Sequence, residues 1–139
     1  MATFTLSIVT PEHILFEEEV ESIIVPGAKG YLGVLAHHAP LITPIMPGMM
    51  TVRKSTATEI IMAISGGFLE VSHNQATVLA DAVEYADEID IERAKGALER
   101  VRKRFQERPE GLDFDRAIAS MRRAENRLKI FESIAVERR

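Results

Sequence analysis

The sequence predicts an α+β protein in which an N-terminal antiparallel β-sandwich is followed by a C-terminal antiparallel two-helix hairpin. Short apolar runs with a period of two, separated by turn residues, fill residues 1–87. From residue 88 the apolar spacing changes to alternating threes and fours, which is typical of paired helices. Charge changes at the same place, from three basic and ten acidic residues to fourteen basic and eleven acidic. We therefore expect two domains, residues 1–87 and 88–139.

The predicted strands of the first domain follow one another with short turns between them. Residues 4–9 alternate apolar and polar side chains, and residues 14–16 and 20–25 suggest two strands separated by the acidic segment 17–19. Further strands are expected at residues 31–35, 41–45, 49–54, 59–64, 68–72 and 76–80. Eight or more short strands in about 80 residues indicate a sandwich or a flattened barrel.

Two helices are predicted in the second domain, at residues 90–107 and 113–135, and Pro109 and Gly111 lie in the loop between them. Their apolar seams are Ile91, Ala94, Leu98, Val101 and Phe105, and Phe114, Ala117, Met121, Ala124, Leu128, Phe131 and Ala135. Short helices with several seam alanines are marginal by themselves in water. The hairpin should therefore dock on the sandwich, or open and extend along a partner.

Both predicted helices start with the same pattern. Residues 89–94 and residues 112–117 each run apolar, Asp, apolar, acidic, Arg, Ala. An Asp just before an apolar helical pattern can accept hydrogen bonds from the unpaired N–H groups of the first turn, so Asp90 and Asp113 are expected to be N-caps. A further hypothesis is that Asp90 and Arg93, three residues apart, also belong to a ligand site.

Four arginines of the hairpin are spaced so that each pair lies on one helical stripe. Arg93 and Arg100 are seven residues apart, and Arg123 and Arg127 are four apart. Guanidinium groups match phosphate oxygens and stay protonated, so a closed hairpin could bring these residues to a polyphosphate. The alternative is a solvated basic face with ion pairs four residues apart. The acidic first domain and an isoelectric point near 5.6 argue against nucleic acid.

No catalytic or metal-binding motif is apparent. His37 and His38 are adjacent and point to opposite faces of an extended chain, so they do not form a chelating pair. The Ser65-Gly66-Gly67 turn lacks the Gly-x-Ser-x-Gly pattern of a nucleophile elbow. The chain has no Cys and no apolar run long enough to span a membrane. We expect neither a signal peptide nor a transit peptide, because the N-terminus leads directly into an alternating strand pattern.

Several segments resemble the epsilon subunits of bacterial F-type ATP synthases. The resemblance rests on residues 33–41 (GVLAHHAPL), 45–48 (IMPG), 65–71 (SGGFLEV) and 77–81 (TVLAD), together with the opening strand and the helical hairpin. It implies a sandwich of about ten strands followed by two helices. It also implies a non-catalytic central-stalk subunit, peripheral at the cytoplasmic face of the bacterial cell membrane, which binds the gamma subunit and the c-ring. When its helices extend toward the catalytic alpha and beta subunits, it would restrain ATP hydrolysis.

ATP as a regulatory ligand, rather than a catalytic cofactor, is also implied by the resemblance. Similar epsilon subunits bind ATP through an Ile/Leu-Asp-x-x-Arg-Ala motif, which corresponds here to residues 89–94. By the resemblance, Glu84, Asp90 and Arg93 would lie near the adenosine part and Arg100, Arg123 and Arg127 near the phosphates. Ile89 and Ala94 complete the motif. Lys29 and Tyr31 stand in the turn where some relatives carry an acidic residue facing the c-ring, so that contact is not transferred.

A competing hypothesis makes the protein a constitutive structural coupler of the rotor that senses no nucleotide. In that case the basic hairpin would bind acidic protein surfaces. Binding would then depend on the positive charge of the hairpin and not on Asp90.

Overall fold

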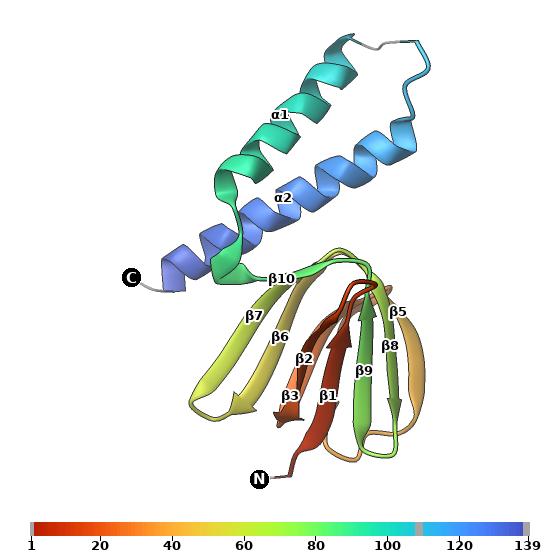
Figure 1. The fold of residues 1–139 in the computed structure, drawn as a ribbon, viewed down its shortest axis with the longest axis vertical. Helices are drawn as coiled ribbons and strands as arrows, with labels where there is room; N and C mark the ends of the chain where they lie inside the picture. The colour runs from red at the N-terminus through yellow and green to blue at the C-terminus, as the bar shows by residue number, and fades with distance from the viewer. Residues whose placement is uncertain (1, 108–109, 138–139) are drawn as a thin grey trace. The chain divides into compact units, whose positions relative to one another are not determined.

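The computed structural model describes residues 2–107 and 110–137, with side chains described up to residue 132. The chain divides into two compact units between Tyr85 and Ala86, whereas the sequence placed the boundary at 87/88. The first unit consists of ten strands and the second is a helical hairpin (Figure 1). The sequence-based fold class, a sandwich followed by two helices, is confirmed.

The strands of the first unit form one continuous ten-stranded sheet. The strands are β1 (Phe4–Val9), β2 (Ile14–Val20), β3 (Ser22–Gly27), β4 (Gly30–Leu35), β5 (Leu41–Ile45), β6 (Gly48–Ser55), β7 (Thr58–Ile64), β8 (Gly67–Ser72), β9 (Gln75–Ala80) and β10 (Val83–Tyr85). Their order is β10-β7-β6-β3-β5-β8-β9-β1-β2, and β4 pairs with β3 off this path. The edge strand β2 also contacts β6, where Lys54 Nζ lies 2.8 Å from Glu18 Oε1. This contact brings two distant parts of the sheet together.

Three details of the sheet differ from the sequence prediction. The acidic segment 17–19 does not interrupt a strand but lies inside β2, where its exposed carboxylates occupy an edge strand. β1 and β9 pair in parallel, whereas the other strand pairs among the described residues are antiparallel. A parallel pair needs a long crossover, and the intervening strands supply it here. β10 was not predicted, because three residues are too few to show a period.

The core lies between the two layers of the sandwich. Period-two alternation places Phe4, Leu6 and Ile8 of β1 inward, with at most 2% of each residue exposed. They pack with the buried residues Phe16, Val20, Ile23, Val25, Val34, Ile45, Met50, Val52, Met62, Ile64, Leu69, Val71, Ala76, Val78 and Ala80. Burial of this apolar surface is the main source of stability for the unit.

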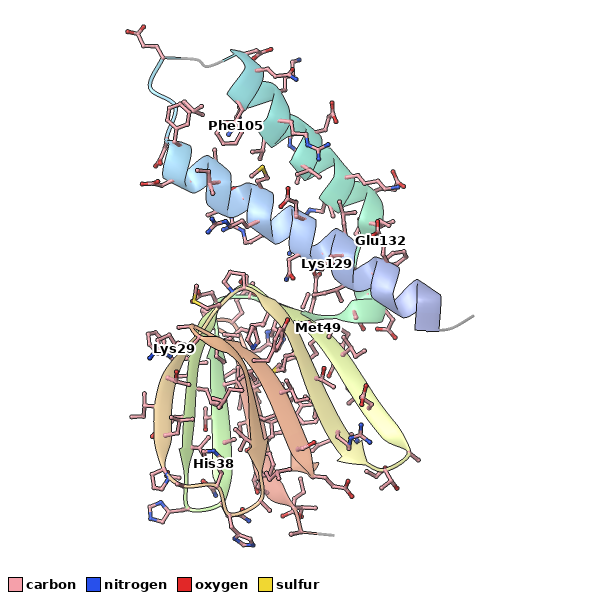
Figure 2. All side chains as sticks on the ribbon, turned by 180° about the vertical axis from the view of Figure 1, so that it is seen from behind. Lys29, His38, Met49, Phe105, Lys129 and Glu132 are labelled. Atoms are coloured by element: carbon pink, nitrogen blue, oxygen red, sulfur yellow. The ribbon has the colours of Figure 1, made fainter. Side chains whose placement is uncertain are left out.

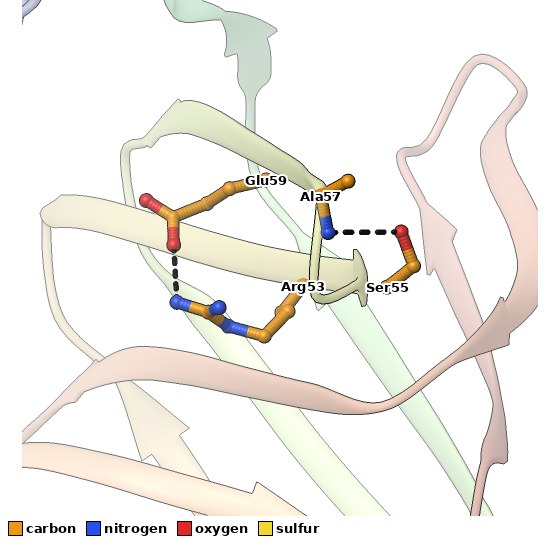
Figure 3. A network of polar contacts seen from close by, with 4 residues as sticks. All are labelled: Arg53, Ser55, Ala57 and Glu59. Atoms are coloured by element: carbon orange, nitrogen blue, oxygen red, sulfur yellow. Dashed lines mark hydrogen bonds and ion pairs between the residues drawn. The ribbon is translucent and has the colours of Figure 1, made fainter. Parts of the chain in front are cut away.

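Turn geometry fixes where the strands end. Gly67 has φ 147°, and a Cβ at this position would lie 2.0 Å from the Leu79 carbonyl oxygen. Only glycine fits there, because the backbone of β9 passes so close. At the β6–β7 hairpin, Arg53 Nη2 donates to Glu59 Oε2 at 2.8 Å and the Ala57 N–H donates to Ser55 Oγ at 3.4 Å (Figure 3).

The second unit contains a 3-10 turn, η1 (Ala86–Glu88), and two antiparallel helices, α1 (Ile91–Glu107) and α2 (Phe114–Glu137). The predicted seam of α1 is confirmed, since Ala94, Leu98 and Val101 are buried. At the loop end the rings of Phe105 and Phe114 stack with centroids 6.0 Å apart, and Figure 2 shows Phe105 directed toward the second helix.

The seam of α2 is only partly as predicted. Ala117 and Ala124 are buried, but Phe114 is 52% exposed, and the buried residue near the C-terminal end is Ile130 rather than Leu128. The predicted seam residue Ala135 lies outside the described side chains. α2 contacts η1 as well as α1, so its later turns have a second neighbour and bury a different face.

Candidate functional site

The two helix starts have the same capping geometry. The Arg93 N–H donates to Asp90 Oδ1 at 3.0 Å, and the Arg116 N–H donates to Asp113 Oδ1 at 3.1 Å. In both cases the N–H of the following Ala donates to the Asp carbonyl oxygen at 3.0 Å. The predicted N-caps are therefore confirmed. Only Oδ1 of Asp90 takes part in the cap, so Oδ2 is left to accept a further hydrogen bond.

The apolar ends of the motif have a structural explanation. Ile89 precedes the cap and is 6% exposed, whereas Ala94 is the fourth helical residue and is 1% exposed. These are the two positions that a hydrophobic staple joins at a helix start. Ile89 and Ala94 thus hold the entry to α1, which leaves Asp90 and Arg93, both exposed, as the motif residues that a ligand can reach.

The antiparallel pairing places the predicted arginines on one side of the hairpin. We define the shared flank as the side that carries Asp90 and Arg104 of α1 and Asp113, Ser120 and Arg127 of α2, each of which stands just before a seam residue. Two antiparallel helices are exchanged by a two-fold axis perpendicular to the plane that contains them, and this rotation keeps each side of the plane in place. Residues that stand just before seam positions therefore lie on the same side of the hairpin in both helices. Arg93, Arg100 and Arg123 lie three or four residues from flank positions and so belong to it.

Local contacts show how these guanidinium groups are held. Arg100 Nη1 would lie 3.5 Å from a Cβ at Gly96, so its side chain folds back over this glycine toward the start of α1. Arg123 Nη2 donates to Ser120 Oγ at 3.1 Å, one turn earlier on α2. Arg100 and Arg123 are exposed and Arg127 is half-buried.

The remaining predicted site residue belongs to the other unit. Glu84 lies in the middle of β10, where it pairs with Ala63 of β7, and it is half-buried. The hairpin residues are thus brought to one flank by the fold of the second unit, whereas the participation of Glu84 stays a prediction.

A cavity that the sequence does not predict lies at the loop end of the same flank. It has a volume of about 520 Å³, and its lining includes Arg104, Asp113, Arg116 and Ser120. The sequence feature that could have indicated this cavity is the repeat of the helix-start motif at residues 112–117. From the sequence, this repeat predicted only an N-cap at Asp113.

A second candidate surface lies on the outer face of the sandwich. Pro44, Phe68, Leu79, Val9 and Ile14 are successive register partners across β5, β8, β9, β1 and β2. Phe68, Leu79 and Ile14 are 54%, 48% and 59% exposed. An apolar row of this length across five strands is the kind of surface that a protein partner covers.

The part of the chain that the structure describes contains no cluster of three or more His, Asp or Glu residues able to hold a metal ion. Within the same residues, no helix is both long and apolar enough to cross a membrane.

Comparison with known proteins assigns both units to one family. Residues 3–86 match the ATP synthase delta/epsilon chain beta-sandwich domain, and residues 87–132 match the long alpha-helix domain of the same chain. The chain belongs to the ATP synthase delta/epsilon family. The resemblance found in the sequence is thereby confirmed.

One curated relative is the ATP synthase epsilon chain of Moorella thermoacetica, which is 50% identical over 93% of this chain and 96% of that protein. Another is the ATP synthase epsilon chain of Syntrophomonas wolfei, which is 42% identical over 94% of this chain and 96% of that protein. A chain in the Euglena gracilis mitochondrial ATP synthase structure (OSCP/F1/c-ring) is 25% identical with a TM-score of 0.70, and the match covers 100% of this chain and 83% of that one. A chain in the Tetrahymena thermophila mitochondrial ATP synthase central stalk and c-ring shares the fold, at 11% identity, a TM-score of 0.60 and 94% coverage of both chains. As an epsilon chain of this family, the protein is a non-catalytic subunit of the central stalk.

Proposed function

We propose that this epsilon chain couples the gamma subunit to the c-ring and restrains ATP hydrolysis through a hairpin that senses ATP. The shared flank of the hairpin carries the proposal. Arg93, Arg100, Arg123 and Arg127 come from both helices, so a triphosphate bound there would contact α1 and α2 together. Asp90 and Arg100, ten residues apart, are separated by about 15 Å along α1. An extended nucleoside triphosphate has a comparable length.

The chemistry of the flank suits the two ends of such a ligand. The guanidinium groups can each donate two hydrogen bonds to phosphate oxygens. Asp90 Oδ2 can accept from the ribose hydroxyls or the adenine amino group, as the resemblance to ATP-binding epsilon subunits implies. The resemblance also implies a contact of Glu84 with the adenosine part.

A bound ATP would act as a switch by favouring the closed hairpin. It can shift the equilibrium only if it binds the closed state more tightly than the extended state. The seam of the hairpin contains three alanines among its described positions, Ala94, Ala117 and Ala124, so little apolar area opposes separation of the helices. Without ATP the hairpin would extend toward the alpha and beta subunits and block rotation in the direction of hydrolysis.

The sandwich supplies the coupling part of the proposal. We assign the apolar row of Pro44, Phe68, Leu79, Val9 and Ile14 to the contact with the gamma subunit, since this surface is exposed in the chain described here. The c-ring would be contacted by another part of the sandwich. With both contacts the subunit would be a peripheral component at the cytoplasmic face of the bacterial cell membrane.

Calorimetry with neighbouring arginines tests the ATP site. Arg123 lies on the shared flank, whereas the side chain of the adjacent Arg122 is rotated by about 100° around the helix and points away from that flank. We expect Arg123→Gln to weaken ATP binding about tenfold, the effect of losing one hydrogen bond to a charged group, and Arg122→Gln to change it less than about twofold. Titrations with and without magnesium establish whether the ion contributes. An unmodified chain that fails to bind ATP would contradict the proposal.

The second candidate function is that of a constitutive structural coupler of the rotor. The exposed apolar row supports this function as well as it supports the coupling part of the first proposal. This second function predicts that assembly with gamma depends on Phe68 and Leu79, while ATP changes neither hairpin conformation nor the hydrolysis rate. Hydrolysis by the assembled enzyme, measured with unmodified and Arg123→Gln epsilon chains over a range of ATP concentrations, separates the two candidates.

A further inference from the structure

The two helices of the hairpin repeat more than their start motifs. Asp90 and Asp113 are 23 residues apart, and the same shift relates Arg93 to Arg116, Arg100 to Arg123 and Arg104 to Arg127. It also relates Glu84 to Glu107. Every charged residue of the proposed ATP site therefore has a counterpart of the same type. Because the helices are antiparallel, the repeat gives the hairpin an approximate two-fold axis perpendicular to its plane.

This approximate symmetry generates a second constellation at the loop end. The first site combines Asp90, Arg93 and Arg100 of α1 with Arg123 and Arg127 of α2. Exchange of the helices produces a set made of Asp113, Arg116 and Arg123 of α2, with Arg100 and Arg104 of α1.

The structure contains a cavity where the second constellation is expected. The cavity of about 520 Å³ is lined by the polar residues Arg104, Glu110, Asp113, Arg116 and Ser120, with Val101 and Ala117 among its apolar residues. Arg104 and Arg116 are exposed, and neither forms an ion pair or side-chain hydrogen bond with another described residue. Asp113 uses Oδ1 to cap α2, and Glu107 lies 4.0 Å from Lys103 Nζ. Two guanidinium groups and a hydroxyl thus line a space large enough for a chain of phosphates, together with the carboxylates of Glu110 and Asp113, of which Asp113 is engaged in the cap.

We propose that this loop-end cavity is a second binding site for a phosphate chain, held by Arg104 and Arg116 with Ser120 as an additional donor. It uses the same chemistry as the proposed ATP site but does not require that site to exist. Arg100 and Arg123 lie near the symmetry axis and belong to both constellations. Occupation of one site therefore disfavours occupation of the other, through competition for these arginines and repulsion between phosphates.

The loop-end site is tested on the full chain by NMR and calorimetry with ATP and with inorganic tripolyphosphate. The backbone amides of Arg116 and Ser120 report on the loop-end cavity, and the amide of Arg93 reports on the start of α1. We expect tripolyphosphate to cause saturable shifts at the loop-end amides. The double variant Arg104→Gln/Arg116→Gln should reduce its association constant there about 100-fold, about tenfold for each lost charged hydrogen bond.

The double variant Arg102→Gln/Arg122→Gln is the matched control, since it removes the same charge from the same two helices away from the shared flank. It should retain loop-end binding within about twofold. Equal losses in the two double variants would mean that only net charge matters and would overturn the proposal, as would the absence of saturable loop-end shifts in the unmodified chain.

The Arg93→Gln variant distinguishes this site from the proposed ATP site. It should lose the response near residue 93 to ATP while keeping the loop-end response to tripolyphosphate. A chain that shows loop-end binding but no response near residue 93 would refute the ATP site alone. If only nucleotide, and not tripolyphosphate, binds at the loop end, the assignment to a bare phosphate chain is wrong.

Discussion

Asp90 has two roles that substitutions can separate. Its Oδ1 accepts from the Arg93 N–H at 3.0 Å and caps α1, while Oδ2 is assigned to the ligand. Asn is as good an N-cap as Asp, whereas Ala is not. Asp90→Asn should therefore keep the cap and lose the negative charge, and Asp90→Ala should lose both.

The expected magnitudes follow from these contacts. Loss of the cap in Asp90→Ala should destabilise the hairpin by about 1 kcal/mol. Asp90→Asn should lose only the favourable interaction of the carboxylate with the helix dipole, about 0.3–1 kcal/mol. Both variants lose a charge-assisted hydrogen bond to ATP of about 1.5–3 kcal/mol, which corresponds to a 10- to 100-fold weaker association constant.

Circular dichroism melts and calorimetry with ATP measure the two roles independently. Asp113→Ala is the internal control, since it removes the equivalent cap, Asp113 Oδ1 to the Arg116 N–H at 3.1 Å, while leaving the α1 start intact. It should lower helix stability as Asp90→Ala does and change ATP binding at the first site little. If Asp90→Asn binds ATP as tightly as the unmodified chain, the carboxylate does not contact the ligand.

Three further substitutions test the fold. Gly67→Ala should destabilise the sandwich by more than about 2 kcal/mol in urea unfolding, since the new Cβ would lie 2.0 Å from a backbone oxygen. Gly30→Ala is the control: its φ is also positive, at 121°, but its Cβ would meet open space, so it should cost about 1 kcal/mol. Equal losses of stability in the two variants would contradict the steric argument. Leu98→Ala should cost about 2–5 kcal/mol and reduce helix content while leaving the sandwich transition in place; an unchanged helical signal would show that Leu98 does not hold the hairpin together. Glu59→Ala breaks the exposed pair with Arg53 and should change stability by less than about 1 kcal/mol, and a larger loss would indicate that the pair is a structural anchor (Figure 3).

The sequence predicted the elements well where a local period was strong. The seam of α1, the two Asp caps and most strands were correct, because side-chain spacing and capping chemistry act within a few residues. Predictions failed where a neighbour overrides the local pattern. The acidic segment 17–19 lies in a strand because β1 pairs along its length, and Ile130 replaces Leu128 in burial because α2 has a second neighbour in η1.

The candidate site divides in the same way. The sequence by itself determined which residues carry charge, their spacing along each helix, and the repeated start motif. Only tertiary structure decided that arginines from two helices share one flank, because that depends on antiparallel pairing and on which faces are buried. The same pairing turned the second motif, which the sequence explained as a cap, into part of the lining of a cavity with Arg104. Packing of the two helices brings together Arg104 and Arg116, twelve residues apart, and such a contact cannot be predicted from interactions between neighbouring residues.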